Sequence, residues 1–568
     1  MEGIGVRTLV GTLALSAVLL IGGTVMANEH RQWRMSEFTF TAAQEYPNGF
    51  ISPQFDADFT GPDGSIYKVP GFWDGGKTWK VRFTPTMPGK WSYVTSCSNA
   101  EDSGLRNRKG DFSAKEAAGE NPLYAHGGFL KVSENRRHLT YSDGTPFFWL
   151  GDTWWSCPSH LVPFEGSSNP EYPSMFKTLI DKREAQGYTV VQMCFQRFME
   201  NEIPDLNWQE AMCRPEMWKE SAIKRWQEAD RYMTYANDAG IIPVIGLAFS
   251  RGLDSGSVDD WKRTWRYVVA RLGSYGVTWL IGGELSGGGP DKSAKLHQKA
   301  MAIGAAIKET DPYQRAMSIH PGHWSRDSED AWHEEWLDFI MIQGGHGGWV
   351  RVDIYMEPYN SEAGKPVLEC ECHYERINSA RWTKQLGTIT EDEVRMTAYR
   401  AIQCGSFGYT YGAQGLWYPT QNENDMKQSE WGEVIPWWKA IDLPGGEQMK
   451  HLRMCYELVE WWKLEPRPDA VEKEQDAVEQ TPALREKLRI LAKADGERTF
   501  LVYFPIDLDA EIKATFKLGD KATPYAGIWF NPRTGEKTAI AGAISLPGPL
   551  PSRPSSEDWM LILQKHKD

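Results

Sequence analysis

Between about residues 121 and 466, short apolar runs alternate regularly with longer stretches of helical periodicity. Short apolar runs rich in β-branched and aromatic residues predict buried strands, and the longer stretches predict helices. Eight such strand–helix repeats predict an α/β fold, a (β/α)8 TIM barrel spanning 121–466. The predicted strands are Phe147–Leu150, Thr189–Met193, Ile241–Gly246, Val277–Ile281, Ala316–Ile319, Phe339–Ile342, Pro366–Glu369 and Gly408–Tyr411.

An open, doubly wound parallel sheet is the alternative architecture for such a pattern. It is disfavoured because no Gly-x-Gly-x-x-Gly follows the first predicted strand. The glycine-rich segment 282–289 also lacks the Lys-Ser/Thr of a phosphate-binding loop. We therefore expect no nucleotide and no other cofactor.

Both flanks of the barrel carry short alternating apolar runs separated by turn residues, which predict β-sandwiches. The N-terminal sandwich is expected at 28–120, with turns at Gly61–Gly64 and Pro88-Gly89, and a smaller C-terminal sandwich at 487–568. The acidic, weakly apolar segment Asp469–Gln480 predicts a linker within 467–486.

The N-terminus has the pattern of a secretory signal peptide. Arg7 precedes the apolar stretch Leu9–Ile21, and small residues lead to Ala27. The stretch is short of the roughly 20 apolar residues that a membrane-spanning helix needs. We expect residues 1–27 to be cleaved, leaving a secreted or periplasmic protein without a membrane anchor.

Charge and cysteine content narrow the class of protein further. Lys plus Arg number 62 against 76 for Asp plus Glu, a net charge of −14 without a long basic run. Nucleic acid and anionic membranes are therefore poor partners for this chain. Its eight cysteines are too few for a disulfide scaffold, although they allow one or two disulfides.

Carboxylates follow three of the predicted barrel strands. Asp152 comes after the first strand, Glu284 after the fourth, and Glu371 after the seventh. Reacting groups of such barrels lie where the strands end, because packed side chains fill the interior. Two carboxylates facing each other across a pocket are what glycoside hydrolysis requires. Glu284 and Glu371 are the predicted catalytic pair.

Further polar and aromatic residues near strand ends are candidate substrate contacts. Trp154 and Trp155 offer flat faces for sugar rings, although most of the 26 tryptophans must be core. Asp152 either accepts a sugar hydroxyl or caps the turn at Thr153. The remaining candidates are Arg197, His320, His323, His346, Glu369 and His373. We expect His320, His346 and Arg197 to keep Glu371 ionised.

Alternation along the seventh strand puts Glu369, Glu371 and His373 on one face and the cysteines between them on the other. Glu369 is then either a structural acid paired to a barrel arginine or the nucleophile, whereas Glu371 is favoured as the nucleophile. His320, His323 and His333 match no zinc-site spacing, so no metal is expected.

Four segments resemble the apiosidase-like glycoside hydrolases, relatives of the clan A retaining barrels: Gly144–Trp155, Trp279–Glu284, Lys365–Glu375 and Trp529–Gly535. The resemblance implies an N-terminal β-sandwich, a catalytic barrel, a C-terminal β domain of collagen-binding type, and an oligo- or polysaccharide substrate. It also implies that the strand-four acid, here Glu284, is the acid/base and that the strand-seven acid, here Glu371, is the nucleophile.

Two departures from that family bear on the site. The family often has Gly-Gly-Asp where this chain has Glu284, whose longer side chain suggests a substrate other than apiose. Cys370 and Cys372 replace the Gly and Pro that flank the family's nucleophile, so the choice between Glu369 and Glu371 stays open at this point.

The sequence therefore predicts a secreted glycoside hydrolase, retaining in mechanism, that cleaves plant- or microbe-derived polysaccharide or its side chains. The alternative is a non-catalytic secreted carbohydrate- or matrix-binding protein whose barrel has lost activity. Acids at the ends of both strand four and strand seven favour the enzyme. A lyase would need a Tyr, His or Lys base beside a neutralising group, and no such cluster stands out in the sequence.

Overall fold

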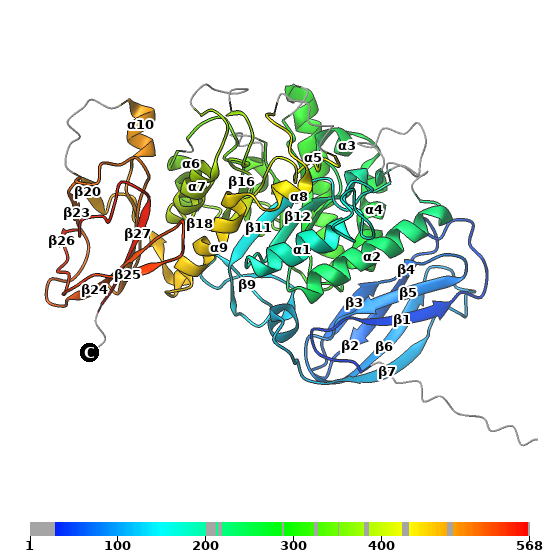
Figure 1. The fold of residues 1–568 in the computed structure, drawn as a ribbon. Coiled ribbons are helices and arrows are strands. Elements are labelled where there is room, and N and C mark those ends of the chain that lie inside the picture. The colour runs from blue at the N-terminus through cyan, green and yellow to red at the C-terminus, as the bar shows by residue number, and fades with distance from the viewer. Residues whose placement is uncertain are drawn as a thin grey trace, which may run out of the picture.

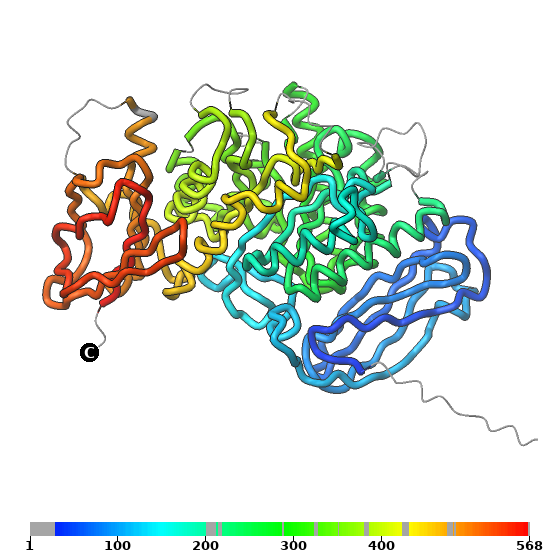
Figure 2. The backbone as a smooth tube through the Cα atoms, in the orientation of Figure 1, coloured from blue at the N-terminus to red at the C-terminus, as the bar shows by residue number. Residues whose placement is uncertain are grey.

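The computed structural model describes residues 29–199, 212–213, 218–286, 289–322, 328–349, 351–379, 386–422, 431–473 and 481–565. A parallel barrel stands between two β-sandwiches, the N-terminal one at the lower right of Figure 1 and the C-terminal one at the left. The tube in Figure 2 shows that the two sandwiches contact different sides of the barrel.

The barrel strands overlap the predicted runs, and the (β/α)8 prediction is confirmed. All neighbours are parallel, in the order β15-β14-β13-β12-β11-β18-β17-β16. The strands are β11 (Trp149–Trp154), β12 (Val190–Cys194), β13 (Ile242–Gly246), β14 (Thr278–Gly283), β15 (Met317–His320), β16 (Ile340–Ile342), β17 (Val367–Glu369) and β18 (Ser406–Tyr411).

The barrel closes between β15 and β16 through individual hydrogen bonds. The hydroxyl of Ser318 donates to the carbonyl of Phe339 at 2.6 Å, and the amide of Asp338 donates to the carbonyl of Met317 at 3.0 Å. Apolar side chains such as Val244, Leu280 and Leu368 fill the interior. The barrel is thus a packed core, and ligands are confined to its rims.

Helices surround the barrel (Figure 1). Capping boxes start two of them, with Ser257 and Asp260 at α4 and Thr390 and Glu393 at α7, which satisfies amides that have no partner inside the helix. The helices are α1 (Met175–Ala185), α2 (Ile223–Asp238), α3 (Ser250–Asp254), α4 (Val258–Leu272), α5 (Pro290–Thr310), α6 (Asp353–Asn360), α7 (Glu391–Gln403), α8 (Trp437–Ala440) and α9 (Pro444–Tyr456).

The N-terminal sandwich docks on the barrel through buried charges. The guanidinium of Arg82 binds both carboxylate oxygens of Asp230 on α2 at 2.7 and 2.8 Å. One antiparallel sheet of this sandwich has the strand order β1 (Ser36–Thr41), β5 (Thr78–Phe83), β4 (Phe72–Trp73). The other has the order β3 (Ile66–Pro70), β2 (Phe55–Thr60), β6 (Gly89–Cys97), β7 (Lys109–Ala114). A small sheet of β8 (Lys131–Val132), β9 (Leu139–Thr140) and β10 (Pro146–Phe147) leads into the barrel.

The C-terminal sandwich is also fastened to the barrel. Arg395 of α7 binds Asp558 at 2.8 Å, and the ring of Tyr399 stacks on Tyr503 with centroids 5.2 Å apart. The larger sheet of this sandwich has the strand order β19 (Glu465–Pro466), β21 (Leu491–Asp495), β22 (Thr499–Phe504), β27 (Trp559–Lys565), β24 (Tyr525–Phe530), β25 (Lys537–Ala539). The smaller sheet has the order β20 (Val471–Lys473), β23 (Ala514–Phe516), β26 (Gly548–Pro549). Within the predicted linker the structure has β20 and most of α10 (Pro482–Lys487).

All eight cysteines are free thiols. The predicted signal peptide lies outside the described residues. Among the residues with described positions, no helix combines the length and the apolar character needed to cross a bilayer.

Candidate active site

A cavity of about 390 Å³ opens at the carboxyl ends of the barrel strands. Both predicted catalytic acids, Glu284 and Glu371, belong to its wall, which also carries aromatic and basic side chains. The lining residues are Trp155, Gln196, Phe249, Ser250, Arg251, Gly252, Glu284, His346, Glu371, Tyr374, Ile377, Trp417 and Trp431.

Two glycines bring Glu284 to this cavity. Gly282 has φ +43°, and the pairing of β14 with β15 shifts register there, which is a bulge that re-aims the strand end. A Cβ on Gly283 would lie 2.8 Å from the ring of Phe249. Glu284 itself has φ +52°, a strained value for a residue other than glycine, and such strain clusters at functional sites. Its side chain is exposed.

Glu371 lies two residues beyond β17 and is deeply buried, with 7% of its surface exposed. The indole N–H of Trp155 donates to Oε2 at 3.2 Å. Nε2 of His346 lies 3.3 Å from Oε1, and Nε2 of His320 lies 3.4 Å from Oε2.

These contacts hold Glu371 as a carboxylate. Burial by itself would raise the pKa of Glu371, but His320 and His346 outweigh it and lower that pKa below its ordinary value. The pKa of His320 is raised, against the effect of its own burial, by Cys370 and Glu371. An ionised carboxylate is the form in which an acidic side chain acts as a nucleophile.

Glu369, the rival candidate on strand seven, has its oxygens occupied by the protein. Oε2 accepts from the hydroxyl of Tyr355 at 2.6 Å, and Oε1 accepts from the amides of Glu371 at 2.9 Å and Gly344 at 3.2 Å. These donors stand in place of the arginine expected from the sequence. Burial raises the pKa of Glu369 to about 7 despite these hydrogen bonds. Glu369 is absent from the cavity wall.

Asp152 and Trp154 form a buried polar cluster rather than a sugar-binding surface. Asp152 accepts from the guanidinium of Arg183 at 2.7 Å, the indole of Trp154 at 2.9 Å and the amide of Thr153 at 2.8 Å. Both side chains are fully buried. Of the two interpretations of Asp152, the turn at Thr153 is the one that its contacts favour.

The expected shared face of Glu369, Glu371 and His373 ends with the strand. β17 stops at Glu369, and His373 has φ +42°, so alternation no longer holds. The ring of His373 contacts Thr397 on α7 at 2.6 Å and the carbonyl of Gly348 at 2.9 Å, away from the cavity.

Two more candidates are placed differently. The guanidinium of Arg197 lies 5.1 Å from the ring centroid of Tyr418, next to Trp417 of the cavity wall. His323 falls outside the described residues. No three metal-ligating side chains gather into one cluster in the parts of the chain that are described.

Comparison with known proteins decides the family. The family described as "Apiosidase-like, catalytic domain" matches residues 133–463, more than half of the chain, and a domain of unknown function (DUF5060) matches residues 29–98. The chain belongs to the apiosidase-like glycoside hydrolases. This match confirms the family resemblance that the sequence motifs indicated.

Solved structures share the fold of this apiosidase-like protein at low identity. A glycoside hydrolase has 20% identity and TM-score 0.63, covering 78% of this chain and 98% of its own. A Bacteroides vulgatus protein provisionally described as a glycoside hydrolase has 19% identity and TM-score 0.69, covering 95% and 100%. A family 5 glycoside hydrolase from the same organism has 20% identity and TM-score 0.59, covering 78% and 94%. No curated protein matches the chain.

Several wall residues of this apiosidase-like site were not identified from the sequence. Tyr374 lies inside the strand-seven motif, Arg251 follows β13, and Trp417 follows β18. The same rule that selected Glu284, a polar or aromatic residue just beyond a strand end, could have found all three.

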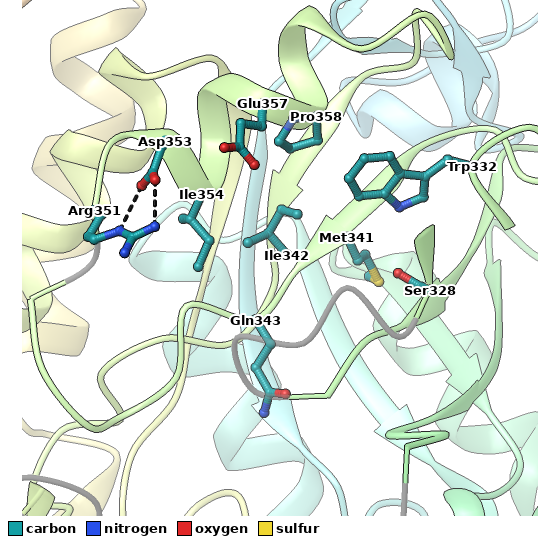
Figure 3. Close-up of a pocket in the computed structure, with 10 residues that line it drawn as sticks. All are labelled: Ser328, Trp332, Met341, Ile342, Gln343, Arg351, Asp353, Ile354, Glu357 and Pro358. Carbon is teal, nitrogen blue, oxygen red and sulfur yellow. Dashed lines mark hydrogen bonds and ion pairs between the residues drawn. The ribbon is translucent and has the colours of Figure 1, made fainter. Parts of the chain in front are cut away.

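A second, smaller cavity of about 160 Å³ lies between β16 and α6 (Figure 3). Gln343, Trp332 and Glu357 are part of its wall, and Arg351 pairs with Asp353 at its edge at 2.5 Å. Neither Glu284 nor Glu371 lines it. Both predicted catalytic acids therefore line the larger of these two cavities.

Proposed function

We propose that this protein is a secreted, retaining glycoside hydrolase in which Glu371 is the nucleophile and Glu284 the acid/base. The observation that carries the proposal is that both acids line one cavity in opposite environments. Glu371 is buried among donors that keep it ionised, whereas Glu284 is exposed at the rim. Two carboxylates in contrasting surroundings are the arrangement that divides acid from nucleophile in glycosidases.

In this mechanism Glu371 attacks the anomeric carbon while Glu284 donates a proton to the departing glycosidic oxygen. The carbon–oxygen bond breaks and a glycosyl–Glu371 ester forms. Glu284, now a carboxylate, takes a proton from water, which attacks the same carbon and releases the sugar and ionised Glu371. Two displacements retain the anomeric configuration, and they require about 5–5.5 Å between the two carboxyl groups.

The proposed substrate is a terminal sugar or short side chain of a plant- or microbe-derived polysaccharide. A cavity of about 390 Å³ is near the lower end of the roughly 300–1,000 Å³ of small-molecule sites. Trp155, Trp417 and Trp431 in its wall supply aromatic surface for sugar rings. Glu284, in place of the family's frequent aspartate, supports a sugar other than apiose. The pattern of residues 1–27 supports export.

The test is hydrolysis of a panel of aryl glycosides, followed by NMR of the first product released. Wild type is expected to release a sugar of unchanged anomeric configuration, and Glu371→Gln is expected to be inactive. Initial inversion of the anomeric centre would overturn the retaining mechanism. Turnover by Glu371→Gln at the wild-type rate would overturn the assignment of the nucleophile.

A further inference from the structure

We infer that Glu369 is a positioning residue which, with Tyr355, holds the main chain of Glu371 and the loop of His346 in their working geometry. The inference rests on the proposed function, in which Glu371 is the nucleophile. Glu369 is fully buried and lies outside the cavity wall, so any effect it has on the reaction passes through other residues.

One oxygen of Glu369 joins two loops of the active site. Oε1 accepts the amide N–H of Glu371 itself and the amide N–H of Gly344, which begins the loop to His346. The same loops are joined next to this point, because the amide of Gly345 donates to the carbonyl of Glu371 at 3.0 Å. The carboxyl group of Glu369 thus binds both the main chain of Glu371 and the main chain of the loop that carries His346.

The other oxygen of Glu369 is fixed from outside the barrel. The hydroxyl of Tyr355 donates to Oε2 at 2.6 Å, and Tyr355 is 1% exposed. Tyr355 belongs to α6, the helix whose Ile354 and Glu357 are drawn in Figure 3. A buried helix side chain therefore sets the rotamer of the acid that orients Glu371.

The chemistry of the side chain separates positioning from mere space filling. A glutamine can keep both amide bonds with its carbonyl and donate its NH₂ to the hydroxyl of Tyr355, which then accepts. A leucine leaves two buried amides without an acceptor, which costs about 1–3 kcal/mol for each group. The loops must then shift to find partners, and a displacement of about 1 Å can reduce the rate about 100-fold.

Glu375 offers a matched control on the same segment. It is buried, accepts from the hydroxyl of Tyr411 at 2.7 Å and accepts from the amide of Gly445 at 3.2 Å. Glu375 therefore accepts from donors similar to those of Glu369, but its amide donor, Gly445, belongs to α9 and not to the loop that carries Glu371.

The experiment measures kcat, KM and thermal unfolding for Glu369→Leu, Glu369→Gln, Tyr355→Phe and Glu375→Leu on one aryl glycoside. We expect Glu369→Leu to lose about 100-fold in kcat with KM little changed, Glu369→Gln to recover most of this loss, and Tyr355→Phe to lie between. Glu375→Leu should lower the unfolding temperature without the kcat loss. If Glu369→Leu does not fold, Glu369→Gln and Tyr355→Phe decide: a Tyr355→Phe enzyme with wild-type kcat overturns the inference.

Two further outcomes also overturn it. One is wild-type kcat in folded Glu369→Leu, and the other is an equal kcat loss in folded Glu375→Leu, which would mean general destabilisation. Failure of the proposed function gives a different result, since Glu371→Gln would then retain turnover whatever the Glu369 variants do.

Discussion

Nε2 of His346 lies 3.3 Å from Oε1 of Glu371, while Nδ1 of the same ring accepts the amide N–H of Tyr374 at 3.3 Å. Because Nδ1 is an acceptor, the ring N–H is on Nε2, which faces the carboxylate. The backbone of Tyr374 therefore selects the tautomer that stabilises an ionised Glu371.

Replacing His346 by alanine should raise the pKa of Glu371, because a donor to its buried carboxylate is lost. A hydrogen bond to a charged group contributes about 1.5–3 kcal/mol, which corresponds to about one to two pH units. The acidic limb of the pH profile of kcat/KM should move up by that amount. His126→Ala, at an exposed histidine beside Asp143, should leave the limb in place. An unmoved limb in His346→Ala would contradict this role.

Glu284→Ala should spare substrates with good leaving groups more than those with poor ones, because only poor leaving groups need the proton. Azide should accelerate the breakdown of the glycosyl-enzyme in this variant, since it replaces water without a general base. The measurement is a rate series across aryl glycosides of varied leaving-group pKa, with and without azide. Equal losses on every substrate would exclude Glu284 as the acid/base.

Trp155→Phe should lower kcat/KM by about 10- to 100-fold, the equivalent of one lost hydrogen bond to a charged group. The phenyl ring can keep the edge-on packing against Phe249 and His320, whose centroids lie 5.2 and 5.1 Å from the indole. The substitution removes the indole N–H, which donates to Glu371 and also to the hydroxyl of Tyr374, at 3.2 Å each. Steady-state kinetics across pH test this, and unchanged kcat/KM would show that the indole serves packing alone.

The contribution of Glu369 to stability should fall as pH rises from about 4.5 to 7. Burial raises its pKa in the folded protein to about 7 from an ordinary value of 4.5, so the unfolded chain ionises first. Folded Glu369 keeps its proton in this window, and its contribution to stability is therefore greatest below the window. Glu369→Gln cannot ionise, so its unfolding temperature relative to that of wild type should rise between pH 4.5 and 7. A curve identical to that of wild type would contradict the raised pKa.

Asp558→Ala should reduce the free energy of unfolding by about 3–5 kcal/mol, because it removes the buried carboxylate partner of Arg395 and leaves only the exposed Asp392. Arg395 of α7 binds Asp558 at 2.8 Å across the junction of barrel and C-terminal sandwich, and Arg533 binds it at 2.7 Å within the sandwich. Asp353→Ala removes the exposed pair with Arg351 and should cost about 0–1 kcal/mol. Denaturant unfolding of both variants checks the contrast, and equal effects would contradict the importance of burial.

The alternation of apolar runs was enough to predict the barrel and its eight strands, because burial on both faces of a parallel strand demands a continuous apolar run. The same rule located Glu284 and Glu371 at strand ends, where polar side chains leave the packed interior. The segment 467–486 was a weaker prediction. This segment contains β20, whose partner strand β23 lies far along the chain. The local sequence of β20 therefore resembles that of a linker.

The roles of neighbouring residues on strand seven were decided only by the tertiary structure. Sequence alternation treats Glu369, Glu371 and His373 alike, but β17 ends at Glu369 and His373 takes a left-handed φ of +42°. Glu371 faces the cavity because Trp155, His320 and His346 arrive there from other strands, and Glu369 is withdrawn because Tyr355 reaches it from α6. Local sequence sets strand burial and periodicity, whereas the partners of a buried charge come from segments far apart in the chain, which only folding brings together.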